Sequence, residues 1–525
     1  MSEHQKALPI NCATAELSRP PSNVDLTDRL PSASHTATTS TKLRDALKWC
    51  FSFPVMLAVC LVGRVFYEGR GFSVDPDLWW HIKIGEDLLR THHLPTSDPY
   101  SWTVASQPWI AYEWLGDVAF ALVHRAGGLL ALDIFLIVLG SLIMLTIYAL
   151  ASSRAENSKA GFVSAVILST LAFGSFSMRP QMFGYLFLAL TLLILLRFRK
   201  GVSWPVWTLP AIFLLWVNTH GSFIIGIGVI GLYLCAGLWS FRLGQLEAVA
   251  WTRKQRLELE AVFLLCLAVL PITPYGTKLA VYPFDMAFSQ PLNVANIMEW
   301  KPMPFDMAGG KIFLGLVVIF FLLQLFFQFT WKFEELALAA GGTVMACVHV
   351  RFVLLFVPFF APLFAAMLAR WIPPYRRTID KFALNALLMT AVLVAMVHYW
   401  PTQKSLEDKV SQKYPSGALQ YLREHPVSGK LLNTYGYGGY MVLAGTPTFI
   451  DGRGDLFERG GVLADYLHIM HFVPGAFGVL RNYQISVCLL DRDEPLSTVL
   501  LASPDWRRVY SDRTSAIFVR QTPNK

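Results

Sequence analysis

Long apolar runs between residues 45 and 400 constrain the fold of this chain more than any other feature. A helix that crosses a membrane needs about 20 mostly apolar residues, because the hydrocarbon core of a bilayer is about 30 Å thick. We therefore predict a mainly α-helical membrane protein with about eleven transmembrane helices. The runs lie near residues 45–66, 128–151, 160–177, 180–198, 203–218, 221–241, 257–273, 311–330, 334–349, 351–371 and 379–399.

The amino-acid composition agrees with a lipid environment for much of the chain. Only 15% of the residues are charged, whereas soluble domains carry about 25%. The net charge is +8, but the basic residues stand in short clusters between apolar runs rather than in a tract interleaved with aromatic residues. We therefore exclude nucleic acid as a partner.

The basic clusters predict how the chain is oriented in the membrane. With about eleven spans, every cluster falls on one side, which the excess of Lys and Arg assigns to the cytoplasm. The N-terminus is then cytoplasmic, and loops 67–127 and 274–310 face outward together with everything after residue 400. The clusters comprise Lys42, Arg44 and Lys48; Arg154 and Lys159; Arg197, Arg199 and Lys200; Arg242, Arg253, Lys254 and Arg256; and Arg370, Arg376, Arg377 and Lys381.

Three regions follow from these patterns. Residues 1–40 are rich in Ser, Thr, Ala and Pro and are predicted to form a disordered cytoplasmic tail. Residues 41–400 form the transmembrane domain with outer loops 67–127 and 274–310, and residues 401–525, of ordinary soluble composition, form an extracytoplasmic α/β domain. Its predicted strands lie near residues 430–434, 446–450, 485–490, 507–510 and 516–520, and its predicted helices near 416–424, 460–472 and 475–482.

An acidic motif follows the first predicted span. Asp75 can cap a helix that begins at Pro76, and the amphipathic stretch after it is predicted to lie along the membrane surface, with Trp79 and Trp80 at the interface. Asp77 and His81 are four residues apart and share one helix face. A carboxylate beside an imidazole can bind a divalent cation or hold a base in place. The alternative is a helix cap and a solvated interfacial face.

A second set of polar residues marks the outer ends of the spans. Arg179 and Arg351 are lone cations there, which suits recognition of a lipid phosphate by guanidinium or, alternatively, a snorkelling side chain. Asn218 and His220 occupy a tight outer turn, where they either bind a ligand or cap the next helix. Glu113 is either a second acid near Asp77 or a residue that favours a helix N-terminus.

Two further segments belong to this outer side. Loop 274–310 contains Glu299 and several aromatic residues, and its length suits a binding lid. The segment Asp451-Gly452-Arg453-Gly454-Asp455 follows a predicted strand, where ligand sites gather, although turn chemistry explains the same residues.

The layout of these motifs resembles the GT-C superfamily of polytopic membrane glycosyltransferases. That family carries an acidic motif in the first outer loop, just after the first span, where this chain has Asp75 and Asp77. The segments DPDLWWH, DPYSW, PW, EWL, YGYGGY and FIDGR together look like a bacterial group of membrane proteins described as glycosyltransferase-like. The resemblance covers residues 45–525, and this chain departs from the family in having Asp-Pro-Asp followed by His81.

The resemblance implies an enzyme that moves a sugar from a polyprenyl-phosphate-linked donor to an envelope glycan, lipid or protein on the outer face of the bacterial inner membrane. Asp77 or Asp75 would be the base, and His81 and Glu113 would position it or bind a divalent cation. A metal site at Asp77 and His81, for Mg²⁺ or Mn²⁺, is left open. The implied substrate-binding residues are Arg179, Asn218, His220, Glu299 and Arg351, with Arg64 as a weaker candidate for the phosphate.

Two other functions compete with this interpretation. A transporter of lipids or solutes would show internal repeats and charges near the middle of the bilayer, whereas this chain shows no clear repeat and has its charges at the outer boundary. A non-catalytic binding or assembly protein is the other alternative, because a fold does not imply an activity.

Overall fold

Helices make up most of the computed structural model, which describes residues 35–71 and 75–521. The chain divides into two units, residues 1–50 and 51–525. In the first unit, α1 spans His35–Cys50. The predicted disordered tail lies outside the described residues except for its last six positions, which are the first residues of α1.

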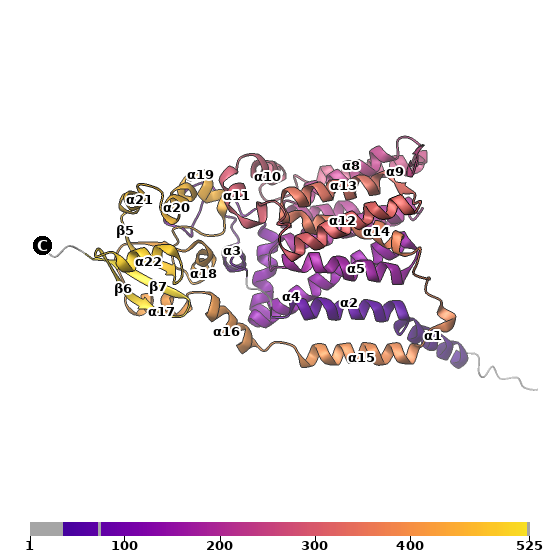
Figure 1. Ribbon diagram of the computed structural model, residues 1–525, viewed down its shortest axis with the longest axis horizontal. Coiled ribbons are helices and arrows are strands. Elements are labelled where there is room, and N and C mark those ends of the chain that lie inside the picture. Colours follow the sequence, from indigo (N-terminus) through magenta and orange to yellow (C-terminus); the bar gives the residue numbers. More distant parts are fainter. Residues whose placement is uncertain (1–34, 72–74, 522–525) are drawn as a thin grey trace, which may run out of the picture. The chain divides into compact units, whose positions relative to one another are not determined.

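Within the second unit, the apolar helices run alongside one another (Figure 1). Helices α4, α5 and α14 pack against each other, and α2 packs between α4 and α15. In chain order the helices are α2 (Phe53–Gly69), α4 (Trp114–Ala155), α5 (Ser158–Ala172), α6 (Gln181–Arg199), α7 (Leu209–Thr219), α8 (Phe223–Ala236), α9 (Arg253–Val269), α12 (Ala308–Phe326), α13 (Phe333–Val348), α14 (Val353–Leu368) and α15 (Phe382–His398).

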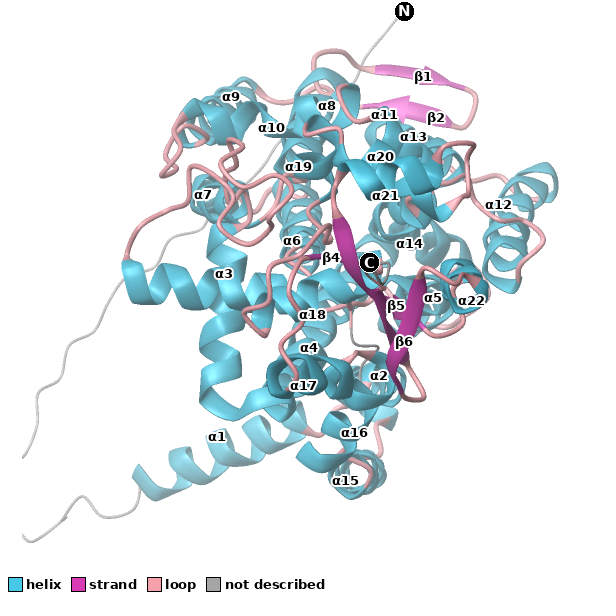
Figure 2. Cartoon of the chain, turned by 90° about the vertical axis from the view of Figure 1, so that its left-hand side faces the viewer, coloured by secondary structure: helices cyan, strands magenta, loops and turns pink. Residues whose placement is uncertain are grey.

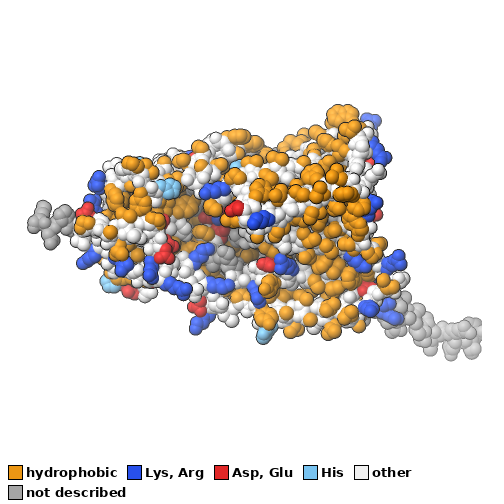
Figure 3. Space-filling view, in the orientation of Figure 1, with side chains coloured by type: hydrophobic (Ala, Val, Ile, Leu, Met, Phe, Trp, Pro, Cys, Tyr) orange, Lys and Arg blue, Asp and Glu red, His pale blue; other side chains and the backbone are white. Residues whose placement is uncertain are grey.

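Exposed apolar side chains identify the lipid-facing surface of this bundle. Leu325 and Phe326 at the end of α12 are 77% and 76% exposed, and Val397 of α15 is 78% exposed. Figure 3 shows apolar side chains covering the helical part of the visible face. Such a surface is stable only when lipid covers it, so the chain is a membrane protein.

The number of spans is smaller than predicted when length and hydropathy are both required. Among the described residues, four segments meet that requirement: α4, α6, α12 and the segment Val350–Leu368. Two helix pairs joined by short breaks would bring the number to six, and α5 and α8 are apolar but shorter. The predicted number of about eleven is therefore not confirmed, because several apolar runs form helices as short as the 11-residue α7.

A break inside α4 separates its N-terminal segment from the long apolar portion that follows. Gly127 and Gly128 leave the helical conformation, and Gly128 has a φ of +61°, which favours glycine. The predicted span at 128–151 begins at this break. The preceding segment from Trp114 therefore forms a separate arm, which packs against α3 (Leu78–Thr91).

The C-terminal region contains a four-stranded sheet with the order β4-β5-β7-β6. Strand β4 runs parallel to β5, and the other neighbours are antiparallel. Figure 2 shows this sheet with α17 and α22 nearby. The strands are β4 (Lys430–Asn433), β5 (Ile485–Asp491), β6 (Trp506–Ser511) and β7 (Ser515–Arg520); the helices are α16 (Gln403–Lys413), α17 (Ser416–Glu424), α18 (Gly438–Leu443), α19 (Gly454–Arg459), α20 (Val462–Met470), α21 (Ala476–Asn482) and α22 (Pro495–Ala502).

The predicted strand at 446–450 is wrong. Thr448 forms only an isolated parallel bridge with Ser101 of the first outer loop. The backbone N–H of Phe449 donates instead to the Asn433 side chain at 2.8 Å. A side-chain amide thus takes the place of a strand partner, and this segment becomes a loop that faces the first outer loop.

Smaller elements complete the fold. A three-stranded sheet of β1, β2 and β3 joins the α8–α9 connection to the start of α13. Helices α10 and α11 occupy loop 274–310. The bounds are β1 (Phe241–Leu243), β2 (Leu246–Ala248), β3 (Trp331–Lys332), α10 (Thr277–Phe288) and α11 (Pro291–Asn296), with 3-10 helices η1 (Phe173–Ser175), η2 (Trp204–Thr208), η3 (Met298–Trp300), η4 (Val350–Phe352), η5 (Arg377–Ile379) and η6 (Tyr435–Tyr437).

The first outer loop and the C-terminal region share one hydrophobic core. Trp80 of α3 and Trp109 pack in the same buried cluster as Leu432 of β4, Phe449 and Phe518 of β7. Trp80 is only 4% exposed, so it is buried in protein rather than at a membrane interface as predicted. This shared core fixes the acidic motif against the C-terminal loops.

Candidate active site

The acidic motif places Asp77 at the start of α3. Asp77 occupies the N-cap position but makes no side-chain cap hydrogen bond. Its backbone N–H donates to Oδ1 of Asp75 at 2.9 Å, so Asp75 stabilises the turn. The Asp77 carboxylate instead accepts from the Trp80 indole at 3.2 Å through Oδ1, and Asp77 lines a cavity.

Arg179 joins three carboxylates from distant parts of the chain. Its Nε donates to Oδ2 of Asp75 at 2.7 Å, and Nη2 lies 2.9 Å from Oδ2 of Asp77. Its Nη1 donates to Oε1 of Glu299 at 2.7 Å. Arg179 precedes α6, so the start of this buried span holds the acidic motif and loop 274–310 together.

A histidine pair surrounds the second acid, Glu113. His81 places Nδ1 2.5 Å from Oδ1 of Asp117, and its Nε2 lies 3.8 Å from Oε2 of Glu113. On the other side, Nε2 of His220 lies 3.5 Å from Oε1 of Glu113. His220 is oriented by Ser222, whose Oγ lies 2.8 Å from Nδ1. The acid thus lies between two imidazoles that are each held by a polar neighbour.

These residues meet in a cavity of about 170 Å³. All the predicted site residues except Asp75, Asn218 and the weaker candidate Arg64 line it. Tyr435, Gly452 and Asp455 of the C-terminal region also line it, together with Asn293 of α11. The first outer loop, the ends of the spans, loop 274–310 and the C-terminal region therefore contribute to one site.

Arg351 differs from Arg179 in its surroundings. Its guanidinium lies over the Trp300 ring at 4.2 Å from the ring centre. Within residues 35–71 and 75–521, it forms no ion pair with a carboxylate. It lines both this cavity and a neighbouring one of about 280 Å³, which Asp75 and Lys413 also line. Arg351 therefore offers an unpaired positive charge to both spaces.

Burial tunes the acids toward neutral pH. Burial raises the pKa of Asp77 to about 7, although Arg179 opposes the rise. Burial likewise raises the pKa of Glu113 to about 8. Charging a buried group costs free energy, and for histidine the same effect lowers the pKa, to about 3 for His220 and well below the usual value for His81. Near neutral pH, both imidazoles are uncharged and Asp77 can exchange a proton.

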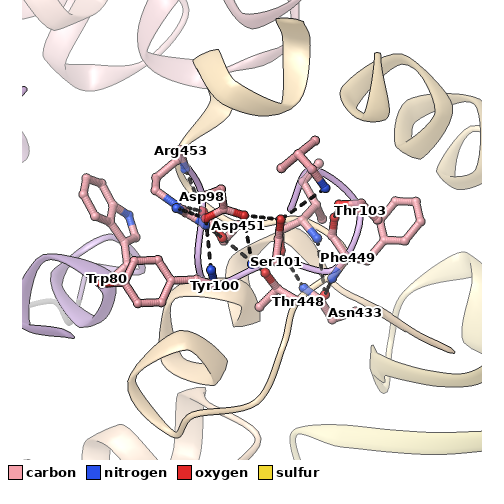
Figure 4. Close-up of polar contacts among 12 residues, drawn as sticks. Trp80, Asp98, Tyr100, Ser101, Thr103, Asn433, Thr448, Phe449, Asp451 and Arg453 are labelled. Carbon is pink, nitrogen blue, oxygen red and sulfur yellow. Dashed lines mark hydrogen bonds and ion pairs between the residues drawn. The ribbon is translucent and has the colours of Figure 1, made fainter. Parts of the chain in front are cut away.

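A buried ion triad connects the first outer loop to the DGRGD segment. Arg453 is fully buried and donates to Asp451 at 2.8 and 2.6 Å and to Asp98 at 2.5 Å. Figure 4 shows Arg453 directed at both carboxylates, with Ser101 also on Asp98. The DGRGD segment is thus more than a simple turn, and its Gly452, Gly454 and Asp455 also line the cavity. It joins the C-terminal region to the first outer loop.

Two predicted residues lie elsewhere. Asn218 accepts from the Trp114 indole at 2.9 Å and donates to the carbonyl of Leu214 at 2.8 Å, so its side chain links helices. Arg64 pairs with Glu68 at 2.6 Å, one turn along α2. Neither side chain lines the cavity.

Asp117 is a site residue that the sequence patterns missed, whereas Asp455 belongs to the DGRGD segment that they marked as a possible ligand site. Asp117 lies four residues after Glu113 on the same helix face, and an acid in an apolar stretch was the available signal. Asp455 accepts from Tyr282 at 2.8 Å, and Tyr282 stacks on Tyr112 at 4.2 Å. Only the docking of loop 274–310 against α19 brings these three together.

We next searched the part of the chain that the structure describes for side chains that could hold a metal ion. No group of three or more His, Cys, Asp or Glu side chains is arranged there to hold an ion. The two residues predicted as ligands contact protein groups: Asp77 contacts Arg179 and Trp80, and His81 contacts Asp117.

No family model and no curated protein matches the sequence. Solved structures resemble it at low identity. ArnT from Cupriavidus metallidurans, bound to undecaprenyl phosphate, is 13% identical with a TM-score of 0.47, and the match covers 93% of this chain and 99% of that one.

Two other solved structures also resemble the chain at low identity. Oligosaccharyltransferase AglB from Archaeoglobus fulgidus, in complex with an inhibitory peptide and a dolichol-phosphate, is 12% identical with a TM-score of 0.46, and the match covers 83% of this chain and 69% of that one. Arabinofuranosyltransferase AftD from Mycobacteria is 13% identical with a TM-score of 0.47, and the match covers 88% of this chain and 41% of that one.

Proposed function

We propose that this protein is a membrane glycosyltransferase that moves a sugar from a polyprenyl-phosphate-linked donor to an envelope acceptor. One observation carries the proposal: a carboxylate poised near neutral pH, Asp77, and an unpaired guanidinium, Arg351, line the same cavity. A base and a cation are the two groups that transfer from a sugar phosphate needs.

Asp77 acts as the base in this mechanism. The acceptor hydroxyl oxygen attacks the anomeric carbon of the donor sugar, and its proton passes to the Asp77 carboxylate. The bond between the anomeric carbon and the phosphate oxygen breaks, and that oxygen leaves with the polyprenyl phosphate. Attack from the face opposite the phosphate inverts the anomeric centre. Asp75 positions Asp77 by accepting a hydrogen bond from its backbone N–H.

Arg351 stabilises the leaving phosphate. The phosphate gains negative charge as the bond breaks, and a guanidinium stabilises this charge by donating paired hydrogen bonds. The second cavity, lined by Arg351 and Lys413, lies next to the site of transfer and has room for the phosphate end of the lipid. Arg179 is held by three carboxylates, so its part is to fix Asp77 and to add positive charge nearby.

The remaining residues orient the reactants. Asp117 orients His81, and Glu113 lies between His81 and His220 at the cavity wall. Loop 274–310 contributes Glu299, and the C-terminal region contributes Tyr435 and Asp455. We assign Tyr435 and Asp455 to binding of the acceptor, because they belong to the C-terminal region, which carries no apolar span. The basic clusters support an outward-facing site on the plasma membrane.

The experiment that tests this proposal is transfer in lipid nanodiscs with a panel of polyprenyl-phosphate sugars. Release of polyprenyl phosphate together with a labelled product identifies the donor and the enzyme class. Donors bound without turnover would contradict the proposal in favour of a non-catalytic protein. Movement of donor across liposome membranes without transfer would contradict it in favour of a transporter.

A further inference from the structure

A separate cavity of about 240 Å³ lies between the start of α2, the start of α5 and the segment that leads into α15. All its lining residues belong to the second unit, and none of them lines the candidate active site. Figure 1 shows α15 alongside α2, and the two helices pack against each other. In the predicted orientation the cavity is at the cytoplasmic surface of the membrane, because both helices begin there.

Three cationic side chains line this cavity without a counter-ion. Lys159 belongs to the start of α5, Arg376 immediately precedes η5, and Lys381 immediately precedes α15. Among the residues that the structure describes, none of the three side chains has a carboxylate partner or donates a hydrogen bond. The Nζ atom of Lys159 lies over the Phe53 ring, 5.8 Å from its centre, and this ring also lines the cavity. The donors of these three cations are therefore available to a ligand.

Asp380 is the carboxylate in the lining, and its oxygens are engaged by other protein groups. Its Oδ2 accepts from the backbone N–H of Phe53 at 3.0 Å and from the Tyr375 hydroxyl at 2.6 Å. Its Oδ1 accepts from the side chain of Asn385 at 2.7 Å. Asp380 thus joins the start of α2 to the start of α15. With three cations against this one acid, the cavity keeps an excess of positive charge, which favours an anion.

Apolar side chains line the same cavity and continue onto the lipid-facing surface. Met56 of α2 contributes to the lining, together with Leu384 and Leu388, which share one face of α15. Leu384 and Leu388 are 47% and 43% exposed, on the helix whose Val397 also faces lipid. A free phosphate gains nothing from this apolar wall, whereas a phospholipid places its phosphate among the cations and an acyl chain along α15. Basic pockets between helices at the cytoplasmic surface are sites where lipid headgroups bind.

We infer that this cavity binds an anionic phospholipid whose headgroup carries no cation, as in phosphatidylglycerol. The phosphate accepts hydrogen bonds from Lys159, Arg376 and Lys381, and the guanidinium of Arg376 can donate two of them side by side. A zwitterionic headgroup fits less well, because its ammonium group would be repelled by the three cations. This site is independent of the proposed transfer reaction and depends only on the protein being in a membrane.

Native mass spectrometry of the full-length protein tests this inference. The wild-type protein, exchanged into mixed micelles with equal phosphatidylglycerol and phosphatidylcholine, should retain the former about tenfold better, because the two lipids share the phosphate and only the latter adds a cation. Equal retention of the two lipids would overturn the inference. This comparison needs no variant, so a folding defect cannot obscure it.

Variants locate the site. Arg376→Gln combined with Lys381→Gln should abolish most of the preference for phosphatidylglycerol, and both side chains are exposed, so the fold should tolerate the change. Arg253→Gln combined with Lys254→Gln is the matched control, because it removes two exposed cations at the start of α9, outside the cavity. An unchanged preference in the cavity variant, or an equal loss in both double variants, would overturn the assignment.

A soluble competitor separates a lipid from a free phosphate ester. Glycerophosphoglycerol has the headgroup of phosphatidylglycerol without its acyl chains, so it should displace the bound lipid poorly. Displacement as effective as that by phosphatidylglycerol itself would overturn the lipid assignment in favour of a soluble ligand.

Discussion

Gly452 lies directly against the carboxylate of Asp77. A Cβ atom on residue 452 would be 1.8 Å from Oδ1 of Asp77 and 2.9 Å from Nε1 of Trp80. Asp77 follows the first apolar helix, whereas Gly452 is part of the C-terminal region. The position of the proposed base therefore depends on the contact between two segments that are far apart in the sequence.

Gly452→Ala should reduce transfer about 100-fold, because displacing a reacting group by about 1 Å has an effect of this size. The measurement is kcat/KM for the sugar donor, at a saturating concentration of the acceptor. Gly436→Ala is the matched control, since its Cβ would have no heavy atom within 4 Å. Equal activity of the two variants would show that Asp77 is not held by this contact.

Arg351→Gln should raise KM for the donor and lower kcat, because the leaving phosphate loses its unpaired cation. We expect a loss of kcat/KM of about 100-fold, as for other groups that stabilise developing charge. Arg370→Gln is the control, since Arg370 also lies over an aromatic ring, that of Phe327, but not at the site. A donor KM that is the same in wild type and Arg351→Gln would remove Arg351 from the phosphate.

The pH dependence should show an acidic limb. Asp77 must be ionised to accept a proton, and burial raises its pKa to about 7. The ionised fraction then rises about tenfold between pH 6 and pH 8, and kcat/KM should rise with it. The measurement is a pH profile of transfer between pH 5.5 and pH 8.5 (about one and a half units on either side of this pKa). A profile that falls over this range would assign the titrating group to an acid instead.

Arg453→Met should destabilise the protein more than any surface substitution. It leaves Asp98 and Asp451 buried without their counter-ion, which costs about 3–5 kcal/mol. Arg256→Met is the control, because Arg256 forms an exposed pair with Glu260, and such pairs contribute about 0–1 kcal/mol. Thermal unfolding in detergent should show a much lower Tm for Arg453→Met. Similar Tm values would contradict the structural role of the triad.

Sequence patterns pointed to several residues that line the candidate cavity, because charged residues are rare in apolar chains. Asp77, His81, Arg179 and Arg351 each interrupt or border an apolar run, and all four line one cavity. The cost of burying a charge in a membrane protein makes such residues functional or paired. Here Arg179 is paired and Arg351 is not, a difference that the sequence alone does not contain.

The rest depended on contacts between distant segments. Asp117 is oriented toward His81 only because the outer arm of α4 packs against α3. The segment 446–450 was predicted as a strand. Its backbone N–H of Phe449 and carbonyl of Ile450 bond instead to the Asn433 side chain. Neither contact leaves a local pattern, since each is set by how separate elements dock.

The most direct test of the central claim is single-turnover transfer by Asp77→Asn in nanodiscs. Asparagine keeps the shape and the acceptor for Trp80 but cannot take the proton, so the rate should fall about 10²- to 10⁴-fold while donor binding persists. Asp306→Asn, at an exposed position, should match wild type. Full activity in Asp77→Asn would contradict the assignment of the base and, with it, the mechanism.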